Sequence, residues 1–294
     1  MSIYALPILY TLLLWWFSTG LILYLDGLPR RTFRWSLGGA TALLAAALYG
    51  LALSSAEQSP FGAYLAFTCG LLVWAWQEMA FLMGFVTGPR REPCPPESRG
   101  WSRAGYALQT IIYHELALVA LAAAVIMVTR DGVNQVGTWT YMILWALRQS
   151  AKLNVFLGVR NLNEEFLPEH LRYLQTYFTR KAMNLLFPLS ITLSTIATVW
   201  LWQRAFAAGA TPFQATGLTF LGTLLTLAVL EHWLLVLPLP ADLLWRWGLR
   251  SRAATAPASR ETQAGSTPPP PNKAGGAHSI SLAADPPCAL RASP

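Results

Sequence analysis

Apolar runs of about 20 residues or more recur along the first 238 positions of this 294-residue chain, and they restrict what it can fold into. As a helix, a run of that length crosses the hydrocarbon core of a bilayer, which is about 30 Å thick. The sequence predicts seven transmembrane helices, at about residues 3–25, 36–56, 61–87, 105–128, 136–158, 183–205 and 213–238.

The composition agrees with a lipid environment. Hydrophobic residues make up 54% of the chain and charged residues only 12%, well below the charged share of a typical soluble domain. Strands are excluded because an open strand in lipid leaves backbone groups unpaired, and the alternating pattern of an outer-membrane barrel is absent. The predicted fold class is therefore all-α, a polytopic transmembrane helix bundle.

The basic residues predict the orientation of the bundle. Lys and Arg gather in loops 26–35, 88–104 and 159–182 and after the last span, whereas the alternate loops hold few. By the positive-inside rule, this pattern places the N-terminus outside and the C-terminus in the cytoplasm. Because the cations flank helices instead of forming a stripe, the net charge of +7 indicates contact with the lipid bilayer and with no nucleic acid.

The segments outside the bilayer differ in kind. Residues 1–252 are expected to form the transmembrane domain, with a short cytoplasmic interfacial helix near 166–180. Residues 253–294 are rich in Pro, Ala and Ser and predict a disordered cytoplasmic tail. The loop around the short helix offers polar candidates for contacts with partners, namely Asn161, Asn163, Glu164, Glu165 and His170.

Seven ionisable residues lie inside the expected spans, and we call this set the polar layer: Glu78, His114, Glu115, Arg148, Lys152, Glu231 and His232. A charged side chain at a helix centre costs about 2.5–3.5 kcal/mol on insertion, so each should face the bundle interior and find a partner. Their depths differ by about one helical turn. We therefore expect them to meet in the cytoplasmic half of the bundle.

The polar layer has three interpretations. In the first, the three glutamates neutralise Arg148 and Lys152, which share a helix face, and the network is structural. In the second, it is a metal or proton-transfer site, with Glu78, His114, Glu115, Glu231 and His232 as candidate ligands, although no Glu-x-x-His spacing occurs. In the third, it binds a tetrapyrrole or a lipid headgroup, with His114 or His232 on the magnesium of a chlorin. No catalytic residue is indicated.

Four stretches carry a family resemblance: WQEMAFLMGFVTGPRR at 76–91, IIYHELAL at 111–118, KLNVFLGVRNLNEEFLPEHLRYLQTYF at 152–178 and EHWLLVLPLP at 231–240. Over about residues 1–250 the chain resembles the photosynthetic complex assembly protein 2 family, also called PuhE-like. The resemblance implies an inner-membrane protein of an anoxygenic phototrophic bacterium. It also implies a role in making the reaction centre and light-harvesting complex, alongside bacteriochlorophyll supply.

Two functional hypotheses follow. The chain is either a non-catalytic assembly factor or a membrane protein that binds or modifies a tetrapyrrole. As an assembly factor it would contact reaction-centre subunits, light-harvesting subunits or pigment-synthesis proteins. The second hypothesis calls for a metal ion or a bacteriochlorophyll-type tetrapyrrole as cofactor. A transporter has no support from an internal repeat. We favour the assembly factor because the familiar metal-binding spacings are absent.

Overall fold

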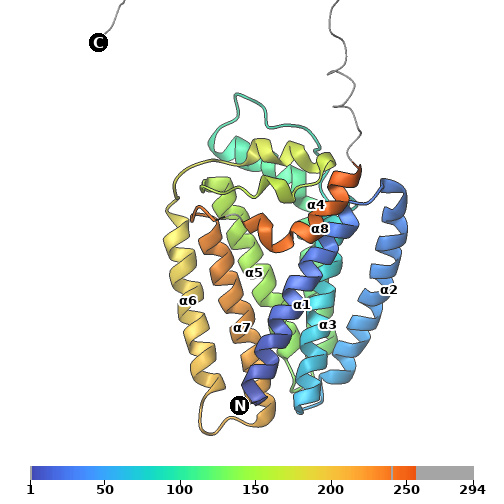
Figure 1. Cartoon of the computed structure of the whole chain (residues 1–294), viewed down its shortest axis with the longest axis vertical. Coiled ribbons are helices and arrows are strands. Elements are labelled where there is room, and N and C mark those ends of the chain that lie inside the picture. The colour runs from blue at the N-terminus through green and yellow to red at the C-terminus, as the bar shows by residue number, and fades with distance from the viewer. Residues whose placement is uncertain (1, 240, 256–294) are drawn as a thin grey trace, which may run out of the picture. The chain divides into compact units, whose positions relative to one another are not determined.

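The structure is a computed structural model that describes residues 2–239 and 241–255. Long α-helices dominate this part of the chain, and each expected span corresponds to one of them (Figure 1). They are α1 Ser2–Asp26, α2 Arg30–Ser54, α3 Pro60–Leu82, α4 Gly100–Thr129, α5 Val136–Leu157, α6 Leu186–Ala205 and α7 Pro212–Leu234.

Six of these helices are long and apolar enough to cross a membrane, and α5 is outside that set. Its second half holds five polar residues, Arg148, Gln149, Ser150, Lys152 and Asn154. Nevertheless α5 runs between the two ends of the bundle. Just before it, the Asn134 N–H donates to the carbonyl of Ser55, after α2, at 2.8 Å; just after it, the Asn161 N–H donates to Leu235, after α7, at 2.9 Å. The all-α class of membrane-spanning helices is confirmed.

Local sequence signals set the starts of α3 and α7. Each helix has proline at its first position, where the missing N–H costs nothing. The Ser59 hydroxyl accepts the N–H of Gly62 at 3.0 Å, and the Thr211 hydroxyl accepts the N–H of Gln214 at 3.2 Å. These caps satisfy backbone donors that helices otherwise leave unpaired at their N-termini.

α3 and α7 form the centre of the bundle. In their most apolar stretches 67% of the residues are buried, against 17–22% in α1, α2, α4 and α6. Between the two central helices the rings of Phe67 and Phe220 stack with their centroids 4.5 Å apart. The outer helices therefore present broad apolar faces outward, as lipid contact requires.

One end of the bundle carries additional structure, and we call it the loop end. It holds the loop 83–99, the 3-10 helices η1 Glu164–Phe166, η2 Glu169–Tyr177 and η3 Ala241–Trp245, and the α-helix α8 Arg246–Thr255. The helix expected near 166–180 is thus the 3-10 helix η2, which follows Pro168. Leu171, Leu174 and Tyr177 turn inward from it and are buried.

α8 crosses α1 at very short range (Figure 1). A Cβ placed on Gly248 would lie 2.4 Å from the carbonyl oxygen of Gly20, and one on Gly20 would lie 2.1 Å from the indole of Trp247. Only glycine leaves room for the two backbones at this crossing. Residues 253–255, the start of the expected tail, form the end of α8, and the rest of that tail lies outside the described residues.

Candidate functional site: the polar layer

Arg148 on α5 and Glu78 on α3 form the first contact of the polar layer. The guanidinium donates to Glu78 Oε2 at 2.9 Å. The other carboxylate oxygen, Oε1, is buried and makes no hydrogen bond within the described residues. This ion pair joins the central helix α3 to α5, and it leaves one acceptor of the carboxylate unused.

Lys152 on α5 and Glu115 on α4 form a second, separate pair. The ammonium lies 2.7 Å from Glu115 Oε1, while the amide of Gln149 donates to Oε2 of the same carboxylate. Because Arg148 and Lys152 are one turn apart on α5, two successive cations hold two different helices. The polar layer thus fastens α3 and α4 to α5.

His114 on α4 binds within the bundle through Gln77. The amide nitrogen of Gln77 lies 2.9 Å from His114 Nδ1 and 3.0 Å from the His114 carbonyl oxygen. Since an amide nitrogen only donates, Nδ1 accepts and the ring proton is on Nε2. Phe81 packs against the imidazole, with the ring centroids 4.5 Å apart.

His232 on α7 uses both ring nitrogens. Nδ1 lies 2.9 Å from the carbonyl oxygen of Ala228, and Nε2 lies 2.9 Å from the hydroxyl oxygen of Ser150 on α5. A carbonyl only accepts, so Nδ1 carries a proton, and in the neutral imidazole Nε2 then accepts from the Ser150 hydroxyl. A neutral imidazole therefore links α7 to α5 without a free ring nitrogen.

Glu231 forms no ion pair with Arg148 or Lys152. Its side chain is exposed, and Oε1 accepts the indole N–H of Trp15 on α1 at 3.0 Å. Among the described residues no Lys or Arg forms an ion pair with it. The sequence predicted that Glu231, with Glu78 and Glu115, would neutralise Arg148 and Lys152. Its direct hydrogen-bond donor is the neutral indole of Trp15, while Arg148 acts on it through its charge without an ion pair.

The candidate metal ligands do not converge. In the stretches 2–239 and 241–255, no three His, Cys, Asp or Glu side chains are close enough together to hold a metal ion. Each candidate instead has its own partner: Arg148 for Glu78, Gln77 for His114, Lys152 for Glu115, Trp15 for Glu231 and Ser150 for His232. The arrangement cross-links helices pair by pair.

The loop candidates form several distinct contacts at the loop end. The amide of Asn161 donates to the carbonyl of Leu234 at 2.7 Å, and Glu164 pairs with Arg180 at 3.2 Å. Asn163 adopts a left-handed backbone with φ 52°, a conformation that asparagine tolerates. The backbone carbonyl of Glu165 accepts a hydrogen bond from Arg252, and His170 lines a cavity.

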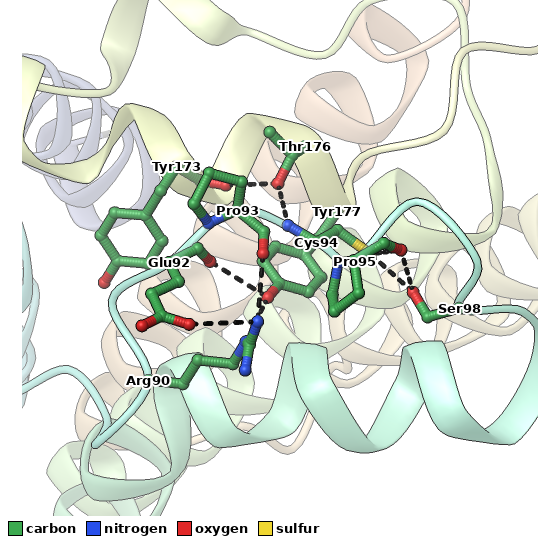
Figure 2. A network of polar contacts seen from close by, with 9 residues as sticks. All are labelled: Arg90, Glu92, Pro93, Cys94, Pro95, Ser98, Tyr173, Thr176 and Tyr177. Atoms are coloured by element: carbon green, nitrogen blue, oxygen red, sulfur yellow. Dashed lines mark hydrogen bonds and ion pairs between the residues drawn. The ribbon is translucent and has the colours of Figure 1, made fainter.

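The loop 83–99 is fastened to η2 by a polar network, shown in Figure 2. Arg90 donates to the phenol of Tyr177 at 2.9 Å and pairs with Glu92 at 3.4 Å. Further along, the Cys94 N–H donates to the hydroxyl of Thr176 at 2.8 Å. Two segments that are about 80 residues apart in sequence thus form one folded surface.

Several partners were not identified from the sequence. Gln77 and Ser150 are neutral, so a search for ionisable residues in spans passes over them, although each is a polar residue in an apolar run. Asp26 and Arg252, which form a buried ion pair, are 226 residues apart and have no sequence signal that connects them. A search for polar residues of every kind inside the spans would have found Gln77 and Ser150.

Comparison with known proteins gives a family. The family model described as "Protein of unknown function (DUF3623)" matches residues 1–256. A protein of Rhodobacter capsulatus, described as an uncharacterized 30.4 kDa protein in the puhA 5' region, is 40% identical over 245 residues, which cover 82% of this chain and 89% of that protein. No solved structure matches.

Proposed function

The chain belongs to this family, and from that premise we propose that it is an integral factor of the bacterial inner membrane that supports assembly of the photosynthetic reaction centre and light-harvesting complex. The observation that carries the proposal is the location of the 40% identical relative, in the puhA 5' region of Rhodobacter capsulatus. The PuhE-like resemblance of the four quoted stretches supports the same role.

The geometry of the polar layer supports a scaffolding role more than a catalytic one. The cations of the polar layer are each paired with a carboxylate, and both histidines hold neighbouring helices through neutral hydrogen bonds. Such contacts order a bundle, because an unpaired charge in lipid is costly. The apolar outer helices and the folded loop end offer two kinds of surface on which subunits could be held.

Deletion of the gene in its phototrophic host tests the proposal. We expect the absorbance bands of the assembled complexes to fall, while reaction-centre and light-harvesting polypeptides are made at normal rates and then degraded. Pulse labelling of these polypeptides and near-infrared spectra of membranes measure the two effects. Accumulation of a single tetrapyrrole intermediate, with polypeptides that persist, would contradict the assembly role and indicate an enzyme of pigment supply.

A second candidate is a pigment-binding protein or a metal-dependent enzyme that acts on a tetrapyrrole. It is favoured by two acceptor groups with spare capacity, the exposed carboxylate of Glu231 and the unpartnered Oε1 of Glu78. His232→Ala and Ser150→Ala form a matched test, because each removes the same hydrogen bond but only the first removes a ligand.

The two candidates differ in the expected outcome. A structural role of His232 predicts that both variants lower the amount of protein in the membrane to a similar degree. Ligation predicts that His232→Ala alone removes pigment or metal from the purified protein, as measured by its absorbance spectrum and by elemental analysis. Similar losses in both variants, with no bound pigment or metal in the wild type, would exclude the second candidate.

A further inference from the structure

A cavity of about 280 Å³ opens at the loop end of the bundle, between the start of α2, the turn after α3 and η2. Arg30 and Phe33 line it from α2, Thr87 and Arg91 from the loop 83–99, and His170 and Tyr173 from η2. None of the seven polar-layer residues lines it, although the carbonyl of Thr87 accepts the N–H of His114 at 3.0 Å. Its volume is close to the lower limit of small-molecule sites.

Three buried polar atoms line the cavity, namely Thr87 Oγ1, His170 Nε2 and Tyr173 OH. The hydroxyls of Thr87 and Tyr173 are close enough to interact with each other, but neither they nor His170 Nε2 form a hydrogen bond of good geometry within the described residues. Thr87 is only 1% exposed. A buried polar atom without a well-formed hydrogen bond destabilises the fold, and it is seldom retained without a reason. Three poorly satisfied polar atoms around one cavity indicate a missing hydrogen-bonding group.

The charges around the cavity have one sign. Arg30 and Arg91 both line it, neither forms an ion pair within the described chain, and none of the lining residues is Asp or Glu. Burial and then the nearby Arg30 hold the pKa of His170 below its ordinary value, and Arg252 and Arg91 act in the same direction. The carbonyl of Leu82 opposes this shift. The cavity therefore favours an anion.

The start of α2 adds to this positive potential. The helix begins at Arg30, its first turn has no acidic residue, and Pro29 before it supplies no side-chain cap. Free backbone N–H groups and the helix dipole attract anions at such a terminus. Because Arg30 is both the first residue of α2 and a lining residue of the cavity, the terminus supplements the charge of the arginines.

The turn after α3 shapes the floor of the cavity. Gly84 has φ 79°, and a Cβ there would lie 3.0 Å from His170 Cδ2 and 3.1 Å from Nε2. The glycine thus allows the imidazole edge to lie directly on the backbone. The carbonyl of the same glycine accepts from Arg91 at 3.3 Å, which leaves most donors of that guanidinium available.

We propose that this cavity binds a phosphate group, held by the guanidiniums of Arg30 and Arg91 and by the hydroxyls of Thr87 and Tyr173. Guanidiniums match the oxygens of phosphate in pairs, and the two hydroxyl groups supply further donors. The group belongs either to an anionic phospholipid or to a soluble phosphate compound. The cavity is near the ends of the membrane-spanning helices, where phospholipid headgroups lie.

Thr87→Val and Arg91→Gln test the site, with Arg31→Gln as the matched control. Arg31 is exposed and adjacent to Arg30, but it does not line the cavity. The full-length protein is purified in detergent, stripped of lipid and titrated with inorganic phosphate while thermal unfolding is followed. A parallel arm measures retained lipid by native mass spectrometry after reconstitution in phosphatidylglycerol or phosphatidylcholine.

One of the two measurements, the phosphate titration or the lipid retention, uses the compound class that the cavity binds. In that measurement we expect the wild type and Arg31→Gln to bind alike. Arg91→Gln should bind at least about tenfold more weakly, the effect of one lost hydrogen bond to a charged group. Stabilisation by inorganic phosphate indicates a soluble source, and selective retention of phosphatidylglycerol indicates a lipid. Thr87→Val is the sharper variant, because it removes a buried hydroxyl of the cavity without changing any charge, and it should weaken binding.

If Arg91→Gln fails to fold, Thr87→Val still decides the question. Equal binding of phosphate and of phosphatidylglycerol by the wild type and Thr87→Val would overturn the proposal. So would binding that Arg31→Gln weakens as much as Arg91→Gln, because attraction to the basic surface as a whole would then account for it.

Discussion

The guanidinium of Arg252 on α8 donates to both carboxylate oxygens of Asp26, the last residue of α1, at 2.8 Å and 3.0 Å. The Asp26 side chain is fully buried. The same guanidinium donates to the carbonyls of Glu165 at 2.7 Å and Phe166 at 3.1 Å. One arginine therefore holds α1, η1 and α8 together at the loop end.

Arg252→Gln should destabilise the protein strongly. It leaves the Asp26 carboxylate buried without its counter-charge, and loss of one partner from a buried pair costs about 3–5 kcal/mol. Thermal unfolding in detergent measures the effect, and Asp26→Asn in the same chain should restore part of it. Arg250→Gln is the control, because Arg250 is exposed and its loss should change stability by no more than about 0.5 kcal/mol. Equal midpoints for the two arginine variants would refute this role of Arg252.

Two truncations should separate α8 from the segment after it. Removal of 256–294 retains Arg252 and every described helix, so we expect normal insertion and an unchanged unfolding midpoint. Removal of 246–294 also removes α8 and the indole of Trp247, whose ring lies 6.1 Å from Phe17 in a stacked arrangement. That chain should unfold at a lower temperature. Immunoblots of membranes and thermal unfolding test both. If removal of 256–294 lowers the unfolding midpoint as much as removal of 246–294 does, the stabilising role assigned to α8 is wrong.

The spans could be read from the sequence because the thickness of the bilayer sets a length that local composition must satisfy. The ends were less certain. The third span was expected to reach residue 87, but α3 ends at Leu82, since Gly84 adopts a left-handed conformation that ends helices. α5 was predicted as a helix because its first half is mostly apolar, although the polar residues from Arg148 onward keep it outside the set of helices apolar enough to cross a membrane.

The loop end could not be predicted in the same way. α8 is basic and has few apolar residues, so its sequence resembles a soluble tail. Its position depends on the close approach of Gly20 and Gly248 and on Arg252, contacts between segments more than 200 residues apart. The polar layer could be predicted in part. Its members were identified because ionisable residues inside a span are costly in lipid, but the pairing of each carboxylate with a cation depends on the rotation of the helices.

Reporter fusions should establish the orientation. The loops that carry most Lys and Arg predict that a phosphatase fused after residue 58, 132 or 209 is active and that one fused after 32, 95 or 260 is inactive. Green fluorescent protein, which fluoresces when it folds in the cytoplasm, should give the opposite pattern and serves as the control. The fusion after 209 tests α5, because its activity would be reversed if α5 did not cross. Phosphatase activity at position 95 would invert the orientation.

The two ion pairs of the polar layer make different predictions for a rescue experiment. Arg148→Leu removes the cation from Glu78 and leaves a carboxylate unpaired in the bundle, so less protein should accumulate in the membrane. Glu78→Gln in the same chain should restore part of the loss, because it removes the stranded charge. Glu115→Gln should not, because the Glu115 carboxylate is already paired with Lys152 and Gln149 when Arg148 is replaced, and its removal leaves the Lys152 ammonium without a counter-charge.

A double-mutant cycle on unfolding midpoints quantifies this difference. We expect a coupling energy of at least about 0.5 kcal/mol between positions 78 and 148, and a smaller one between 115 and 148. The reciprocal cycle, Lys152→Leu with Glu115→Gln, should show strong coupling and is the matched control. Two separate pairs give this pattern, since each suppressor acts only on its own partner. If Glu115→Gln rescues Arg148→Leu as well as Glu78→Gln does, the four residues act as one network and the assignment of separate pairs is wrong.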